Sequence, residues 1–323
     1  MPAVGFRIHP DDVEPVVAGL LGAIDVDDGP QDEQLAVLRA VTRHLLDRSD
    51  LDPAHLVPLS PAELARTITH PGTFRRFHEL LVTLELCRHP ISAAQVDAAE
   101  RYGDALGVRG VERTILRDLV DAGTARAAAD FRRFLDRTLA ERVEPELRDL
   151  PVVDSAEPEL AERLLGLGDL PEGTLGRAFI DFHTRNGLPV PGVEGSRVNH
   201  FFVGHDMTHT ITGIEPTGAG EVALSAFQFA AEDTPLNTAA LLSSLVVHEA
   251  GFERSPSVAA EAGILATPGA ADLLGRELAR GAACSADCSL VDHLELAALP
   301  LAEVRARFGV RPPDTPDDGH HHW

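Results

Sequence analysis

Residues 201–213 read FFVGHDMTHTITG, and this stretch decides how the rest of the chain is interpreted. A helix that starts near Ser196 would place one set of side chains on a single face, because residues three and four apart are neighbours on a helix. That set is Val198, Phe201, Phe202, His205 and His209. Two histidines thus join aromatic side chains on the face expected to be buried, where polar groups need partners. Gly213 fits as the glycine that ends the helix.

A second helix is expected to return a carboxylate toward the two histidines. Eleven residues separate His209 from Glu221, and Gly218 and Gly220 supply a turn between them. Two imidazoles and two carboxylates suit zinc, and iron or manganese are acceptable alternatives. Core histidines satisfied by Asp206 and backbone carbonyls are the other interpretation, but four converging groups favour a metal. The predicted metal ligands, which are also the predicted catalytic residues, are His205, Asp206, His209 and Glu221.

These residues resemble the signature of the family of the fourth coenzyme Q biosynthesis protein, Coq-four. That family carries HDxxH, eleven residues and then Glu, followed closely by a leucine-proline pair. Thr234-Pro235-Leu236 lies where that pair would fall, and a weaker likeness extends the match to about residues 160–311. The family commonly places basic residues just before HDxxH, whereas this chain has residues 200–204, HFFVG, there. This departure leaves the identity of the substrate open.

The resemblance implies a role in quinone or specialised-metabolite biosynthesis, with a metal acting on an aromatic or quinone-like ring that can carry a prenyl tail. The family is associated with replacing a ring carboxyl by a hydroxyl, which makes a metal-dependent oxidative decarboxylase the expected activity. Zinc could polarise a carboxylate or phenolate but has no redox chemistry of its own. The alternative is a non-catalytic scaffold that binds a lipid or quinone and docks other biosynthetic enzymes.

Apolar residues beside the predicted ligands are candidates for substrate binding. They are Phe201, Phe202, Leu224 and Phe227. We expect them to line an apolar channel that ends at the metal and accepts a hydrophobic or prenylated aromatic small molecule. The alternative, in which these side chains simply fill a core, is equally open at this point.

Composition favours an all-α protein of two helical domains. The chain has 323 residues, of which 44% are hydrophobic and only 5% aromatic, so its cores must be built mainly from leucine, valine and alanine. Residues 1–150 are expected to form a helical bundle, in which Ser60-Pro61-Ala62-Glu63 is a capping box that starts a helix. A proline-rich, acidic joint at 144–158 marks the boundary, and 151–311 form the domain with the metal between two helices. Residues 312–323 are expected to be a disordered tail.

The first half also resembles the TerB-like tellurite-resistance helical domain. The resemblance lies in residues 86–92, LCRHPIS, and in the helix expected to end near Gly107. That family often carries acidic residues in this loop, whereas His89, Pro90 and Ile91 stand there in this chain. The resemblance therefore implies a fold and no metal site, and a generic helical bundle is the alternative.

Several classes of function are disfavoured by charge and patterning. The net charge of −23 would repel nucleic acid. No apolar run of 18 residues and no signal peptide is present, so we expect a cytoplasmic protein, with peripheral membrane contact and a homodimer left open. All 28 basic residues are arginine, a bias that we attribute to a G+C-rich bacterial genome. Cys284 and Cys288 are interpreted as ordinary thiols, and His248-Glu249 as a surface pair, with support of the main site as the alternative.

Limited proteolysis tests the proposed joint. Because proline and acidic residues dominate it, the first cut is expected between Val143 and Pro158, and far-ultraviolet circular dichroism should be strongly helical. A first cut within residues 196–232 would contradict this organisation.

Overall fold

The structure is a computed structural model that describes residues 5–108, 121, 143–150, 156–195, 199–251, 262–314 and 319–320. Within these ranges every regular element is a helix, and β-structure is limited to two isolated bridges. The predicted all-α class is therefore confirmed.

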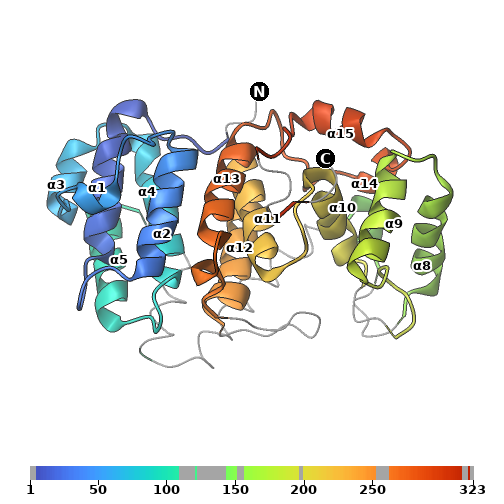
Figure 1. Ribbon diagram of the computed structural model, residues 1–323, viewed down its shortest axis with the longest axis horizontal. Helices are drawn as coiled ribbons and strands as arrows, with labels where there is room; N and C mark the ends of the chain where they lie inside the picture. The colour runs from blue at the N-terminus through green and yellow to red at the C-terminus, as the bar shows by residue number, and fades with distance from the viewer. Residues whose placement is uncertain are drawn as a thin grey trace.

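The helices fall into three groups along the longest axis of the molecule (Figure 1). The first group contains α1 (Val13–Ile24), α2 (Asp32–Ala40), α3 (Pro61–Thr67), α4 (Pro71–Leu86) and α5 (Ala93–Leu106). The central group contains α10 (Phe202–Thr212), α11 (Gly218–Ala231), α12 (Pro235–Ser244) and α13 (Ala270–Ala282). The last group contains α8 (Pro158–Leu165), α9 (Leu175–Asn186), α14 (His293–Leu296) and α15 (Leu301–Phe308).

Several of the predicted helix starts are confirmed by their caps. Ser60 and Glu63 form the predicted reciprocal capping box of α3, with Pro61 in the first turn. Ser92 accepts a hydrogen bond from the backbone N–H of Gln95 and caps α5. Thr234 does the same for α12 through Asn237. Local sequence therefore fixes where these helices begin.

Helix α11 is apolar on all sides and belongs to two hydrophobic cores. Toward the first group it contributes Val222, Ala226, Phe229 and Ala230. Toward the last group it contributes Ala223, Leu224, Phe227 and Ala231. A helix that is hydrophobic all round must be buried all round. The division into two domains stays a prediction, to which the structure adds that α11, beyond residue 158, completes the core of the first helices.

Helix α13 packs between α2 and α11 and brings the backbones close together on both sides (Figure 1). A side chain at Gly275 would meet the backbone carbonyl of Ala40 at the end of α2. A side chain at Gly281 would press on the backbone carbonyl of Phe227 in α11. Glycine at these two positions therefore sets how closely the central helices approach.

The proline-rich joint is fastened at both ends by buried pairs of glutamate and histidine. The Glu144 carboxylate accepts the backbone N–H of His293 at 2.9 Å and lies 2.5 Å from Nδ1 of the same residue. Glu157 makes the same pair of contacts with His200, at 2.8 and 2.5 Å. Both carboxylates are thus satisfied by one histidine each.

The end of the chain also makes specific contacts. The sequence predicts disorder for residues 312–323, yet His320 is buried and its Nε2 lies 2.9 Å from the Glu277 carboxylate and 3.0 Å from Arg280. His320 thus joins a buried ion pair, in which Arg280 donates to the other oxygen of Glu277 at 2.5 Å.

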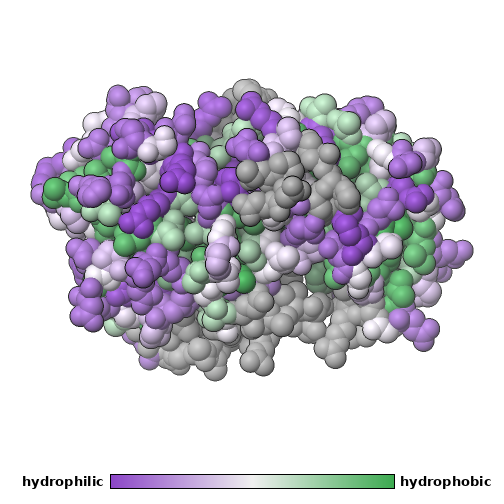
Figure 2. All heavy atoms as spheres, viewed as in Figure 1, coloured by the Kyte–Doolittle hydropathy of each residue, from purple (hydrophilic) through white to green (hydrophobic). Residues whose placement is uncertain are grey.

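The face shown in Figure 2 is mostly hydrophilic where it is coloured. Large exposed hydrophobic side chains of the described ranges come from four separate segments, at Val57, Leu150, Leu165 and Leu188. No helix in the described part of the chain is both long and apolar enough to cross a bilayer.

The contact of Gly281 with α11 generates a stability prediction. Gly281→Ala should lower the free energy of unfolding by about 1–3 kcal/mol, because the added methyl meets fixed backbone. The control is Gly72→Ala in α4, where the methyl meets nothing within 4 Å and should stabilise by roughly 0.5–1 kcal/mol. Urea denaturation measures both, and equal effects would contradict the close approach.

Candidate metal centre

Helix α10 carries the two predicted histidines and is shorter than expected. It begins at Phe202, while residues 196–198 lie outside the described ranges. Its core face is formed by Val203, Met207 and Ile211, which are all fully buried. His205 lies on the opposite side and its side chain is 29% exposed, so the predicted single buried face is wrong for this residue. Gly213 ends the helix in the left-handed conformation with φ 76°, as predicted.

A tight turn delivers the third predicted ligand. Thr217 caps α11 by accepting the backbone N–H of Gly220 at 3.0 Å. Glycine is required at 220, since a side chain there would overlap the backbone carbonyl of Glu215. Glu221 consequently lies in the first turn of α11, as predicted.

Three of the predicted ligands converge on one point. Oε2 of Glu221 lies 3.1 Å from Nε2 of His205, and Oε1 of Glu221 lies 3.2 Å from Nε2 of His209. The two Nε2 atoms are 3.2 Å apart. This arrangement of two imidazoles and a carboxylate is suited to holding a metal ion.

The orientation of His209 is fixed by the protein. Its Nδ1 lies 2.9 Å from the Ile214 carbonyl oxygen, which only accepts, so Nδ1 donates and Nε2 is left to face the other ligands. Phe182 stacks on the His209 ring with centroids 5.6 Å apart. The tautomer that a metal requires is therefore set in advance.

Opposite charges shift the pKa values of His209 and Glu221. Burial disfavours protonation of His209, but the Glu221 carboxylate outweighs it and raises the pKa of this histidine. Burial also disfavours ionisation of Glu221, yet His205 and His209 together hold the pKa of its carboxyl well below the usual value. The site thus favours an ionised carboxylate, which is the form that binds a metal, and a protonated His209, whose proton a metal ion must displace.

The structure does not bring Asp206 into this group. Its carboxylate points toward α9, where Oδ2 lies 3.3 Å from Nε2 of His183. Asp206 follows His205 directly, and neighbouring residues project from a helix about 100° apart. His183 is buried, and neither of its ring nitrogens makes a hydrogen bond.

Two arginines, Arg280 and Arg305, support α10 from its C-terminal end. Arg280 donates to the Thr212 carbonyl at 2.8 Å, and Arg305 donates to the Ile211 carbonyl at 2.8 Å. These carbonyls have no partner within the helix, and cations stabilise this end of the helix dipole. Arg280 lies in the polar part of an amphipathic helix, and no local signal showed where it would reach.

The predicted substrate-binding residues are divided between core and site. Leu224 and Phe227 are fully buried in the core, and Arg280 lies over the Phe227 ring. Phe201 stacks on His200 and is partly buried. Phe202 lies edge-on to His205, with centroids 6.2 Å apart. Of the four, Phe202 is the one in ring contact with a ligand.

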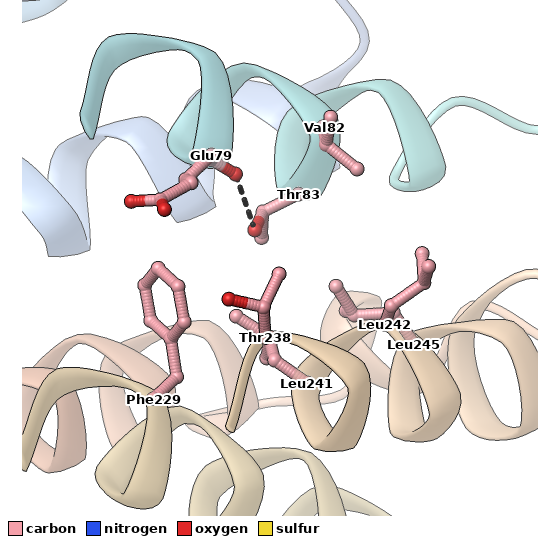
Figure 3. A pocket seen from close by; sticks show the side chains of 8 residues that line it. All are labelled: Glu79, Val82, Thr83, Phe229, Thr238, Leu241, Leu242 and Leu245. Atoms are coloured by element: carbon pink, nitrogen blue, oxygen red, sulfur yellow. Dashed lines mark hydrogen bonds between the residues drawn. The ribbon is translucent and has the colours of Figure 1, made fainter. Parts of the chain in front are cut away.

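An apolar cavity does exist elsewhere, between α4 and the pair α11 and α12 (Figure 3). Phe229, Leu241, Leu242 and Leu245 face Val82 and Thr83 across it. Its volume of about 50 Å³ is far below the roughly 300 Å³ or more of a small-molecule site. This cavity is a packing gap between helices and is too small for a prenylated ring.

The pair His248 and Glu249 is buried, so its interpretation as a surface pair is wrong. Glu249 has no exposed side-chain surface and lies beside Glu33 and His89. The apolar run before it, LLSSLVV at residues 241–247, was the available signal that this segment is buried. Cys87, Cys284 and Cys288 are buried free thiols, and burial raises the pKa of each.

Comparisons with known proteins found one weak structural similarity. No protein-family model matches the chain, and no curated protein is significantly similar to it. Among solved structures, a protein from Nostoc punctiforme that is provisionally described as a ubiquinone biosynthesis protein matches with a TM-score of 0.33 and 19% identity, over 73% of this chain and 98% of that chain. Similarity at this level does not transfer an activity.

Elemental analysis of the purified protein tests the metal centre. A His205→Ala, His209→Ala double variant should lose about one equivalent of zinc or another transition metal, because both imidazole ligands are removed. The control is the double variant His55→Ala, His70→Ala, which removes two histidines that are more exposed than His205. It should keep the metal content of the wild-type protein. Full retention of metal by the first variant would rule out this centre.

Proposed function

We propose that the protein is a metal-dependent enzyme whose ion is held by His205, His209 and Glu221. The convergence of two Nε2 atoms and a carboxylate within 3.2 Å carries this proposal. Three protein ligands leave a coordination position for substrate or water, which is typical of catalytic sites and not of structural ones. Zinc suits this ligand set, and iron or manganese are alternatives.

The protein groups have different tasks in this proposal. His209 is fully buried and fixed by the Ile214 carbonyl, so it anchors the ion from the core side. His205 is 29% exposed and Glu221 is 20% exposed, so substrate approaches past these two side chains. A bound metal would supply a Lewis acid that polarises a carboxylate or phenolate oxygen.

An aromatic or quinone-like ring is the proposed substrate class. Phe202 supports this choice, because its ring borders His205 at the exposed side and can contact an aromatic face. The resemblance of residues 204–221 and 234–236 to the Coq-four signature supports a ring that carries a carboxyl group and a prenyl tail. In the proposed overall reaction the ring carboxylic acid, dioxygen and water give the ring hydroxyl, carbon dioxide and hydrogen peroxide. Dioxygen is the two-electron oxidant, and water supplies the hydroxyl oxygen.

Turnover of a prenylated hydroxybenzoate tests the function. Glu221→Gln nearly preserves volume but removes the ligand charge, so carbon dioxide release by the metal-loaded protein should fall on the order of 100-fold. Glu232→Gln, at the other end of α11, makes the same chemical change away from the centre and should keep full turnover.

Lipid retention is measured in the same samples to separate enzyme from scaffold. Loss of turnover with retained ligand supports the enzyme. A wild-type protein that binds the prenylated ring without converting it, and does so equally well after Glu221→Gln, would overturn the proposal in favour of a binding scaffold.

A further inference from the structure

A second cluster of ligand-type side chains lies where the first helices meet the central ones. Glu33 lies in the first turn of α2, His89 follows α4, and Glu249 ends the π-helical turn η6 (Leu245–Glu249). Nε2 of His89 is 2.5 Å from Oε1 of Glu249 and 3.8 Å from Oε2 of Glu33. One ligand atom from each residue lies within 4.8 Å of the other two.

The charges in this cluster are unbalanced. Two carboxylates face one imidazole, and the exposed fractions of the Glu33 and Glu249 side chains are only 11% and 0%. Oε1 of Glu33 is buried and has no hydrogen-bond partner, which is costly for a carboxylate. A divalent cation would neutralise both carboxylates and provide a partner for the free oxygen.

The three side chains are held in place by other groups. Oε2 of Glu249 accepts the backbone N–H of Leu265 at 2.9 Å. The Gln31 side chain accepts the backbone N–H of His89 at 2.9 Å and donates to its carbonyl at 3.1 Å. Such outer contacts orient metal ligands. Isolated π-helical turns are also frequent at functional sites.

A groove gives the cluster access to solvent. It has a volume of about 480 Å³ and runs between α2 and residues 265–272, with Glu33 in its wall. The groove therefore reaches the cluster at Glu33, and the His89 side chain is itself 29% exposed. By contrast, both carboxylate oxygens of Glu144, and both of Glu157, already have a partner atom on one histidine.

We propose that Glu33, His89 and Glu249 bind a divalent transition-metal cation. Two carboxylates and one imidazole suit zinc, manganese or iron, and their charge matches that of the ion. The ion links α2 and the loop after α4 to the end of η6, so it stabilises the packing of the first helices on the central ones. It shares no residue with the centre at His205 and does not depend on the proposed enzyme function.

Metal titration of the full chain tests this second site. The chain is stripped with a chelator and titrated with zinc, and the His205→Ala, His209→Ala variant should still bind about one equivalent. Adding His89→Ala to it should weaken that binding on the order of 100-fold. Adding His44→Ala instead is the matched control, because His44 pairs at 2.7 Å with Asp272 in the same groove, and should leave binding unchanged.

A second measurement guards against loss of folding in the double variant. In the otherwise wild-type chain, His89→Ala should bind one zinc fewer than wild type, and added zinc should raise the Tm of wild type more than that of the variant. Equal zinc content in wild type and His89→Ala would overturn the proposal. The cluster would then be a carboxyl pair that shares a proton beside His89.

Discussion

The burial of α11 on all sides is the constraint on which the rest of the structure depends. Because every face of this helix is apolar, it needs partners in all directions, and it finds them in the first helices, in α13 and in the helices around α9. Close approach of α13 depends on Gly281, which lies against the Phe227 carbonyl. The start of α11 remains partly open to solvent, and there Glu221 meets His205 and His209. A rigid core thus positions a partly exposed ligand group.

Buried glutamate–histidine contacts recur through the molecule, and their hydrogen bonds separate structural pairs from candidate sites. Glu144 and Glu157 each contact both the backbone N–H and Nδ1 of one histidine, so each of their carboxylate oxygens already has a partner. At Glu221 two imidazoles face one carboxylate, and at Glu249 a second carboxylate crowds one imidazole. The additional imidazole in the first cluster and the additional carboxylate in the second are what make these two clusters suited to a metal.

Much of the fold could be predicted because helix boundaries are encoded locally. Ser60, Thr234 and Gly213 act within four residues of their own positions, so their roles are readable from sequence alone. Which side of α10 is buried could not be predicted from local sequence. Aromatic residues at 201 and 202 indicated the buried side, but Val203, Met207 and Ile211 are the residues of α10 that join the hydrophobic core, and only the packing of the other helices decides this.

The sequence by itself determined the pair His205 and His209, since residues four apart are neighbours on a helix. It also indicated Glu221, because Gly218 and Gly220 mark a turn that leads into the next helix. The tertiary structure decided that Asp206 meets His183, because the position of α9 lies outside any local pattern. It alone also assembled Glu33, His89 and Glu249. His89 and Glu249 are 160 residues apart, and no spacing rule reaches across that distance, so only the packing of α2 against the central helices could bring them together.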